Sequence, residues 1–144
     1  MVYLDTSCLL KLFLVEPESD AIAEIIGQKS RVIISALTEL EAEIQLKAAC
    51  MGGRIRLSQW REHQQKLAGF REFEPFEFRT LSGDVFSAAL EQNRQQPKIH
   101  CRTLDRLHLA AMAELKVKSL LTLDQGQAAA AQAMGYEIIR PGQS

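Results

Sequence analysis

The sequence has little cysteine, no long apolar run and no excess of either charge, and each of these absences excludes a class of protein. Cys8, Cys50 and Cys101 are far apart and form no Cys-x-x-Cys pair, which argues against a disulfide framework and a zinc knuckle. No apolar run approaches the roughly 18 residues of a membrane span, and no signal segment is visible after Met1. We therefore expect reduced thiols, no membrane association and a cytoplasmic location.

The charge balance excludes a further class. The chain carries 17 basic and 18 acidic residues, a formal net charge of −1, so it does not hold nucleic acid by bulk positive charge as histone-like proteins do. A local nucleic-acid site stays open. The length of 144 residues and the hydrophobic content of 47% suit one globular domain that spans residues 1–144.

Short apolar runs alternate with segments of helical periodicity along the whole chain. This alternation predicts an α/β fold whose central, mainly parallel sheet of about five strands is flanked by helices. Ligands of such sheets bind at the carboxyl ends of the strands. The predicted strands are 2–4, 31–34, 76–81, 119–123 and 136–139, and the predicted helices are 6–14, 19–27, 36–51, 57–73, 83–95, 103–115 and 127–134.

Acidic residues follow two of these predicted strands. Asp5 closes the first strand and Asp124 closes the fourth. Each has a local alternative role, since aspartate is a good helix N-cap and a common turn residue. Their position at carboxyl ends also makes both of them candidates for a site at that edge of the sheet.

Glu41 lies on the predicted helix 36–51. Its local alternative is a capping box that begins at Thr38. The apolar residues of this helix recur at helical spacing, and we expect their stripe to face the core with Glu41 inside it. A carboxylate on a buried face is costly unless it is paired or binds a cation, which favours a functional role. The stripe consists of Leu37, Leu40, Ile44, Ala48 and Met51, and Glu39 and Glu43 are expected on the polar face.

Asp105 stands in the first turn of the predicted helix 103–115. A negative charge there suits the helix dipole, which is its local explanation. Leu109 and Met112 follow it at i+4 and i+7, so Asp105 also borders the apolar face of the helix.

Four acids gathered at one sheet edge would repel one another and need a positive partner. No buried lysine or arginine accompanies them in the pattern, and carboxylate oxygens suit Mg²⁺ or Mn²⁺. Such ions activate water for displacement at phosphorus. Because no histidine stands in an evident general-base position, we expect water rather than a ribose hydroxyl to be the nucleophile.

Several neighbours have candidate supporting roles. The hydroxyls of Ser7 and Thr122 flank two of the acids and could orient a carboxylate, although capping and strand propensity explain them equally well. Lys11, Arg102 and Arg106 are candidate phosphate contacts, with solvated surface charge as the alternative. His108, at i+3 from Asp105, either packs in the helix or faces the same groove.

Four short motifs, in order from end to end of the chain, resemble those of the PIN-domain family, and most closely its VapC-type toxins. The first is Tyr3-Leu4-Asp5-Thr6-Ser7 and the second is Ser35-Ala36-Leu37-Thr38 leading to Glu41. The third is Thr103-Leu104-Asp105-Arg106-Leu107-His108-Leu109-Ala110 and the fourth is Leu121-Thr122-Leu123-Asp124.

The resemblance implies a three-layer PIN-like fold and a metal-dependent endoribonuclease. Asp5, Glu41, Asp105 and Asp124 would be its catalytic, Mg²⁺- or Mn²⁺-binding residues. It further implies a homodimer, a cognate antitoxin protein and a structured RNA substrate such as tRNA or rRNA. Many relatives carry another acid just after the position of Asp124, where this chain has Gln125 and Gln127, so the number of bound metal ions stays open.

Two other enzyme classes that place an aspartate after a first strand fit the sequence less well. A phosphatase of the haloacid dehalogenase type needs a second acid two positions after Asp5, where Ser7 stands, and a response-regulator receiver needs an aspartate after the third strand, where the chain reads Thr80-Leu81-Ser82. A PIN-like module with weak catalysis that binds RNA or a protein stays open.

With the four acids neutralised by metal, 17 basic residues face 14 acidic ones, so RNA affinity should be modest and dependent on divalent ions.

Overall fold

The computed structural model describes residues 1–142, and its centre is one parallel sheet. The strands are β1 (Val2–Leu4), β2 (Val32–Ser35), β3 (Phe76–Arg79), β4 (Ser119–Leu121) and β5 (Glu137–Ile139), in the order β3-β2-β1-β4-β5. All four neighbouring pairs are parallel. The sheet confirms the predicted α/β class and strand count.

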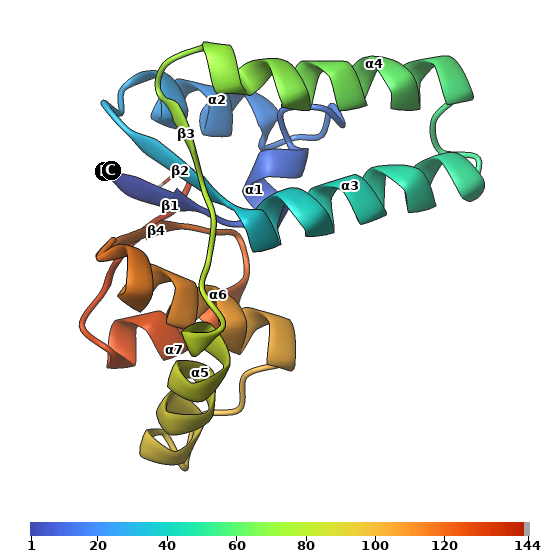
Figure 1. The fold of residues 1–144 in the computed structure, drawn as a ribbon. Coiled ribbons are helices and arrows are strands. Elements are labelled where there is room, and N and C mark those ends of the chain that lie inside the picture. Colours follow the sequence, from blue (N-terminus) through green and yellow to red (C-terminus); the bar gives the residue numbers. More distant parts are fainter. Residues whose placement is uncertain (143–144) are drawn as a thin grey trace.

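Helices cover both faces of this sheet (Figure 1). Helices α1 to α4 lie on one face and α5 to α7 on the other, which gives three layers, and α3 and α4 extend side by side beyond the sheet edge. The bounds are α1 Thr6–Leu10, α2 Ser19–Gly27, α3 Ala36–Met51, α4 Leu57–Gly69, a 3-10 turn Phe70–Glu72, α5 Asp84–Gln95, α6 Thr103–Leu115 and α7 Gln125–Ala133. No helix among residues 1–142 is long and apolar enough to cross a membrane.

The core has two halves because successive residues of a strand point to opposite faces. Leu4 and Ile34 pack with Leu46 on the face of α1 to α4. Tyr3 and Ile33 instead pack toward α6 and α7. All of these side chains are fully buried, as expected for strands covered on both faces. Tyr3 is thus the one phenol among aliphatic side chains of the inner strands.

Helix α3 buries the opposite stripe from the one that its large apolar residues predict. The buried residues are Thr38, Ala42, Leu46 and Ala49, whereas Ile44 is 58% and Met51 is 79% exposed. The helix has two apolar stripes, and it packs against α1 and α4 through the one with small side chains, which permits close approach. The capping box at Thr38 is also wrong: Ser35 is the N-cap, and its hydroxyl accepts from the Thr38 N–H at 3.2 Å.

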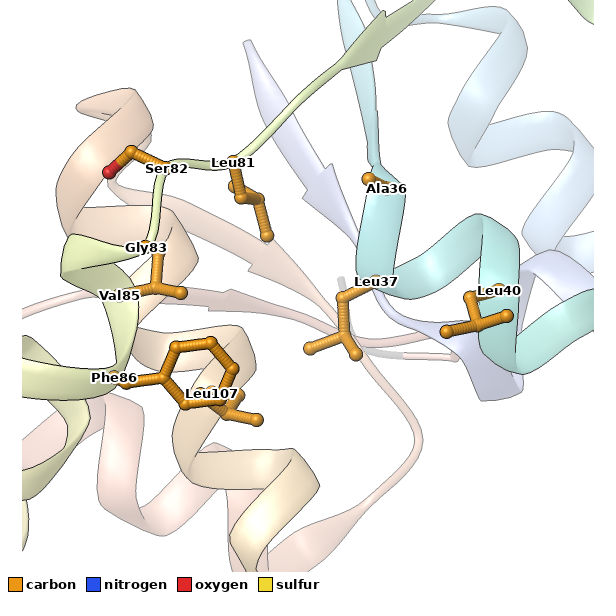
Figure 2. Close-up of a pocket in the computed structure, with 9 residues that line it drawn as sticks. All are labelled: Ala36, Leu37, Leu40, Leu81, Ser82, Gly83, Val85, Phe86 and Leu107. Carbon is orange, nitrogen blue, oxygen red and sulfur yellow. The ribbon is translucent and has the colours of Figure 1, made fainter.

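The exposed apolar stripe of α3, which includes Leu40 and Ile44, forms one side of an apolar surface. Across from it lie side chains of α5 and α6, and a groove of about 310 Å³ runs between Leu37 and Leu40 on one side and Phe86 and Leu107 on the other (Figure 2). We call this surface the apolar face; its exposed large residues are Leu40 and Ile44 of α3 and Phe86 and Leu90 of α5. A surface of this kind marks a binding interface more often than a solvated face.

The order of the strands places the candidate site. The chain runs outward from β1 through β2 to β3, then crosses to β4 on the other side of β1 and continues to β5. The order reverses between β1 and β4, and the crevice outside the carboxyl ends of two such strands is the general ligand site of open α/β sheets. Asp5 follows β1, and Thr122 and Asp124 follow β4, so these residues meet at that crevice.

Candidate active site

Asp5 is the centre of the site and is held by neutral donors. It is the N-cap of α1 and is only 5% exposed. One carboxylate oxygen, Oδ1, accepts from the Thr6 N–H at 2.8 Å. The other, Oδ2, accepts from the Ser7 hydroxyl at 2.8 Å and the Thr122 hydroxyl at 2.7 Å. These bonds fix the orientation of the carboxylate without neutralising its charge.

A third residue supports Asp5 from α7. Gln127 is buried, and with its amide nitrogen turned toward Asp5 it donates to both carboxylate oxygens at 3.2 Å. Its backbone N–H also donates to the Asp124 carboxylate at 2.8 Å. The sequence marks Gln127 only as a departure from an acidic position, yet the structure makes it a link between two of the acids.

Burial and hydrogen bonding act in opposite directions on Asp5. Removal from water raises the pKa of its carboxyl, while the nearby His108 and the donors Thr122, Ser7 and Thr6 lower it, and the pKa stays above its ordinary value. The carboxyl therefore has an unmet demand for positive charge, which a bound cation would satisfy.

Glu41 reaches the site from the second turn of α3 and is half buried. Its Oε1 accepts from the Thr6 hydroxyl at 3.0 Å and is hydrogen-bonded to Nε2 of His108. Burial raises the pKa of the Glu41 carboxyl, but the hydrogen bond and charge of His108 and the bond from Thr6 outweigh it, so this pKa lies below its ordinary value. The contacts with His108 and Thr6 therefore favour the ionised form of Glu41.

Asp105 and Asp124 share a cation. The Arg102 guanidinium donates to Asp105 Oδ2 at 3.1 Å and to Asp124 Oδ2 at 3.3 Å, and its side chain is 74% exposed. Asp124 caps α7 instead of marking a turn before Gly126. Arg102 is exposed, so it does not contradict the expectation that no buried lysine or arginine accompanies the acids. It is one of the three predicted phosphate contacts, and the structure places it beside two of the acids.

The other two predicted phosphate contacts lie differently. Lys11 pairs with Glu16 and with Glu18, the latter at 3.1 Å, so its charge is already compensated. Arg106 is only 4% exposed and donates to the Gln96 side chain at 2.7 Å. Neither side chain presents a free cationic group to solvent in this arrangement, and a role for either in RNA binding stays a prediction.

The four acids belong to one hydrogen-bonded assembly. The Thr122 hydroxyl joins Asp5 to Asp124 by donating to the Asp5 carboxylate and accepting from the Asp124 N–H at 3.0 Å. Thr6 joins Asp5 to Glu41, and Arg102 joins Asp124 to Asp105. The sequence suggests the contact of Thr122 with a carboxylate, whereas the links through Thr6 and Arg102 depend on how α3, α6 and α7 are oriented around β1.

The donor set fits a hard divalent cation. Within residues 1–142 no three His, Cys, Asp or Glu side chains converge at metal-ligand spacing. Mg²⁺ does not require such a cage, because it usually binds through one or two carboxylates and retains several waters. A set of four carboxylates, with donors that orient Asp5 and Glu41 from behind, meets that requirement.

Comparison with known proteins agrees with this fold. The PIN domain family model matches residues 2–133. Ribonuclease VapC35 of Mycobacterium tuberculosis is 31% identical over an alignment of 150 residues, which covers 100% of this chain and 99% of that protein.

Solved structures share the fold at lower sequence identity. The Mycobacterium tuberculosis toxin VapC20, described as cleaving the sarcin-ricin loop, superposes with a TM-score of 0.74 at 16% identity and covers 98% of this chain and 100% of its own. FitAcB of Neisseria gonorrhoeae superposes with a TM-score of 0.73 at 14% identity and covers 100% of both chains. The family match, the full-length relative and the five-stranded parallel sheet agree, and the chain belongs to the PIN-domain family, among its VapC-type ribonucleases.

Proposed function

We propose that the chain is a divalent-metal-dependent endoribonuclease that acts as the toxin of a toxin–antitoxin pair and hydrolyses phosphodiester bonds in structured RNA, such as tRNA or rRNA. The observation that carries this proposal is the buried, uncompensated carboxylate of Asp5 at the crevice between β1 and β4, joined by hydrogen bonds to three further acids. The relation to Ribonuclease VapC35 supports RNA as the substrate class.

The chemistry assigns separate tasks to the residues. Asp5, Glu41, Asp105 and Asp124 would hold Mg²⁺ or Mn²⁺, which when bound lowers the pKa of a coordinated water and stabilises the charge that develops at phosphorus. The Ser7 and Thr122 hydroxyls both donate to Asp5 Oδ2 and hold the carboxylate in one orientation. Because α1 and α7 both begin at the crevice, their N-termini also favour negative charge there.

Removal of the metal gives the direct test of the proposed activity. Purified protein with Mg²⁺ or Mn²⁺ should cut an RNA mixture that contains tRNA and rRNA, and an excess of chelator should reduce cleavage to the background of an enzyme-free control. Re-addition of Mn²⁺ should restore it. Absence of cleavage with every RNA and both metals would refute the nuclease and leave a binding module, detected by retention of labelled RNA.

Arg102 offers a second test, because its guanidinium is hydrogen-bonded to both Asp105 and Asp124. Removal of its charge in Arg102→Gln should free Asp105 and Asp124 and tighten Mn²⁺ binding by up to about fivefold, because exposed ion pairs are weak. Isothermal titration of metal-free protein measures the change. A role in RNA contact alone predicts unchanged Mn²⁺ affinity and a higher KM for RNA. Lys11→Gln is the matched control, since Lys11 pairs with acids outside the site.

The partners follow from the same assignment. We propose that a cognate antitoxin protein and a second copy of the chain bind it, and that it acts in the cytoplasm, where its RNA substrates are found. The apolar face is the surface that supports a homodimer, since Leu40, Ile44 and Phe86 are each more than half exposed. The antitoxin would be encoded beside the gene, and its co-expression should relieve growth arrest caused by the chain alone.

A further inference from the structure

A row of buried polar side chains runs from the core to the active site. The hydroxyl of Tyr3 lies 2.6 Å from Ser35 Oγ and 2.7 Å from Nδ1 of His108. The opposite ring nitrogen, Nε2, is hydrogen-bonded to Glu41 Oε1. Tyr3 is fully buried and His108 is 1% exposed. The row therefore connects the central strand β1 to α6 and then to a carboxylate on α3.

This row is unexpected among its neighbours. Leu109, Met112 and Leu120 around it are apolar and fully buried, and burial of a phenol and an imidazole is unfavourable unless each polar atom has a partner. Tyr3 and His108 meet that condition through each other, through Ser35 and Thr38 on the Tyr3 side, and through Glu41 on the His108 side. A phenylalanine and a leucine would fill the same space without that condition, so packing alone does not account for the polar atoms.

The position of one hydrogen follows from the contacts. The Glu41 carboxylate can only accept, so Nε2 of His108 carries the hydrogen in both the neutral and the cationic ring. Since Tyr3 is bonded to Nδ1, the ring is fixed at both ends. Full burial and two engaged nitrogens also leave His108 no route to an RNA atom, so it is not a general base.

The two hydrogen bonds on Glu41 reach the same oxygen. Thr6 Oγ1 at 3.0 Å and His108 Nε2 both bond to Oε1, and among residues 1–142 no donor reaches Oε2. The carboxylate is therefore anchored by one oxygen while the other is left for a ligand. Orientation of a metal-binding carboxylate by a buried donor is a recognised means of setting metal affinity.

We propose that His108 is a positioning residue for the active site: its Nε2–H fixes the Glu41 carboxylate so that Oε2 faces the cation, and Tyr3 fixes the imidazole. The inference rests on the proposed metal-dependent function. It gives the orientation of a metal-binding carboxylate to two residues, His108 and Tyr3, that do not themselves contact RNA.

Two substitutions separate positioning from packing. In His108→Gln the amide nitrogen can take the place of Nε2 and still donate to Glu41, whereas in His108→Asn the shorter amide can reach only the place of Nδ1, beside Tyr3. Both amides are smaller than the ring, so a purely structural role predicts a loss of Mn²⁺ affinity in each variant that follows its loss of thermal stability. Positioning predicts that His108→Asn weakens Mn²⁺ binding by about 10- to 100-fold and that His108→Gln retains it within about threefold.

The measurement uses the full chain without RNA. Mn²⁺ dissociation constants come from electron paramagnetic resonance of the free ion, and thermal unfolding in chelator monitors the fold of each variant. His63→Asn, a histidine of α4 packed edge-on against Phe13, is the control and should leave Mn²⁺ affinity unchanged. Tyr3→Phe should weaken Mn²⁺ binding less than His108→Asn does, because Tyr3 acts on Glu41 only through the imidazole of His108.

The outcomes distinguish this inference from the proposed function. Equal loss of Mn²⁺ affinity in the glutamine and asparagine variants, or no loss in either, would overturn the positioning role while RNA cleavage by the wild type stands. Mn²⁺ binding that follows the expected order, with no RNA cleavage by the wild type, would support the positioning role and refute the nuclease. Failure of the wild type to bind Mn²⁺ would overturn both.

Discussion

Replacement of Asp5 by asparagine should lower the rate of RNA cleavage by about a thousandfold, because each tenfold corresponds to 1.36 kcal/mol and a bound metal supplies several kcal/mol at the transition state. The fold should survive, since asparagine caps a helix as well as aspartate does and can still accept from the Thr6 N–H. Single-turnover cleavage in Mn²⁺ measures the rate, and circular dichroism with thermal unfolding measures the fold.

The control for this substitution is Asp20→Asn, an exposed aspartate in the first turn of α2. It removes the same charge at a helix start but far from the β1–β4 crevice, so cleavage should change by less than about twofold, with a loss of helix stability of about 0.3–1 kcal/mol. Cleavage by Asp5→Asn at more than a tenth of the wild-type rate would remove Asp5 from the centre of the site.

The second large effect concerns stability. Leu46→Ala should lower the free energy of unfolding by about 2–5 kcal/mol, because it leaves a cavity in a packed core where Leu46 is fully buried. Met51→Ala in the same helix should change it by less than about 0.5 kcal/mol, since Met51 is exposed. Chemical denaturation in urea, with equal slopes for all proteins, gives both values.

The result also tests the orientation of α3. If its large apolar stripe faced the core, Met51→Ala would be the damaging change and Leu46→Ala the tolerated one.

Repeating the wild-type experiment at two protein concentrations tests the proposed homodimer, because association that stabilises the folded state raises the unfolding midpoint with concentration. A midpoint independent of concentration over a hundredfold range would count against a dimer.

Most of the fold could be predicted from local sequence patterns. Helix 36–51 and helix 103–115 begin and end where their periodicity and caps indicate, because strong local signals such as Gly52 after the first of them coincide with the tertiary structure. The order of the strands did not follow from periodicity, although the alternation of strands and helices restricts it to a few possibilities.

The orientation of α3 was the main error, and its cause is physical. Hydrophobicity ranks Ile44 and Leu40 above Ala42 and Ala49, but a helix that must lie close to two others buries small side chains. The same helix then leaves its larger residues for the apolar face. A hydrophobicity pattern identifies the apolar residues of a helix, but it does not show which neighbouring element each of them contacts.

The sequence identifies the acids of the candidate site and two hydroxyls that hold Asp5, those of Ser7 and Thr122, but it does not identify the roles of His108 and Gln127. Asp5 and Asp124 follow strands, a position that the rule for parallel sheets identifies as functional. His108 and Gln127 show no such signal, because a single polar residue on a helix is ordinary until its neighbours are known. The only sign for His108 is its place at i+3 from Asp105, on the side that α6 turns toward Tyr3.

The central place of β1 has a consequence for synthesis of the protein. Val2–Leu4 is made first but pairs on one side with Ser119–Leu121, which is made near the end, and Asp124 and Gln127 come later still. A ribosome-bound chain therefore has no complete set of active-site acids until most of its length has emerged, because a domain folds as a unit once its strands are available. A chain interrupted before Asp124 would lack this acid and Gln127, so on the proposed assignment premature termination would yield an inactive fragment instead of an unregulated nuclease.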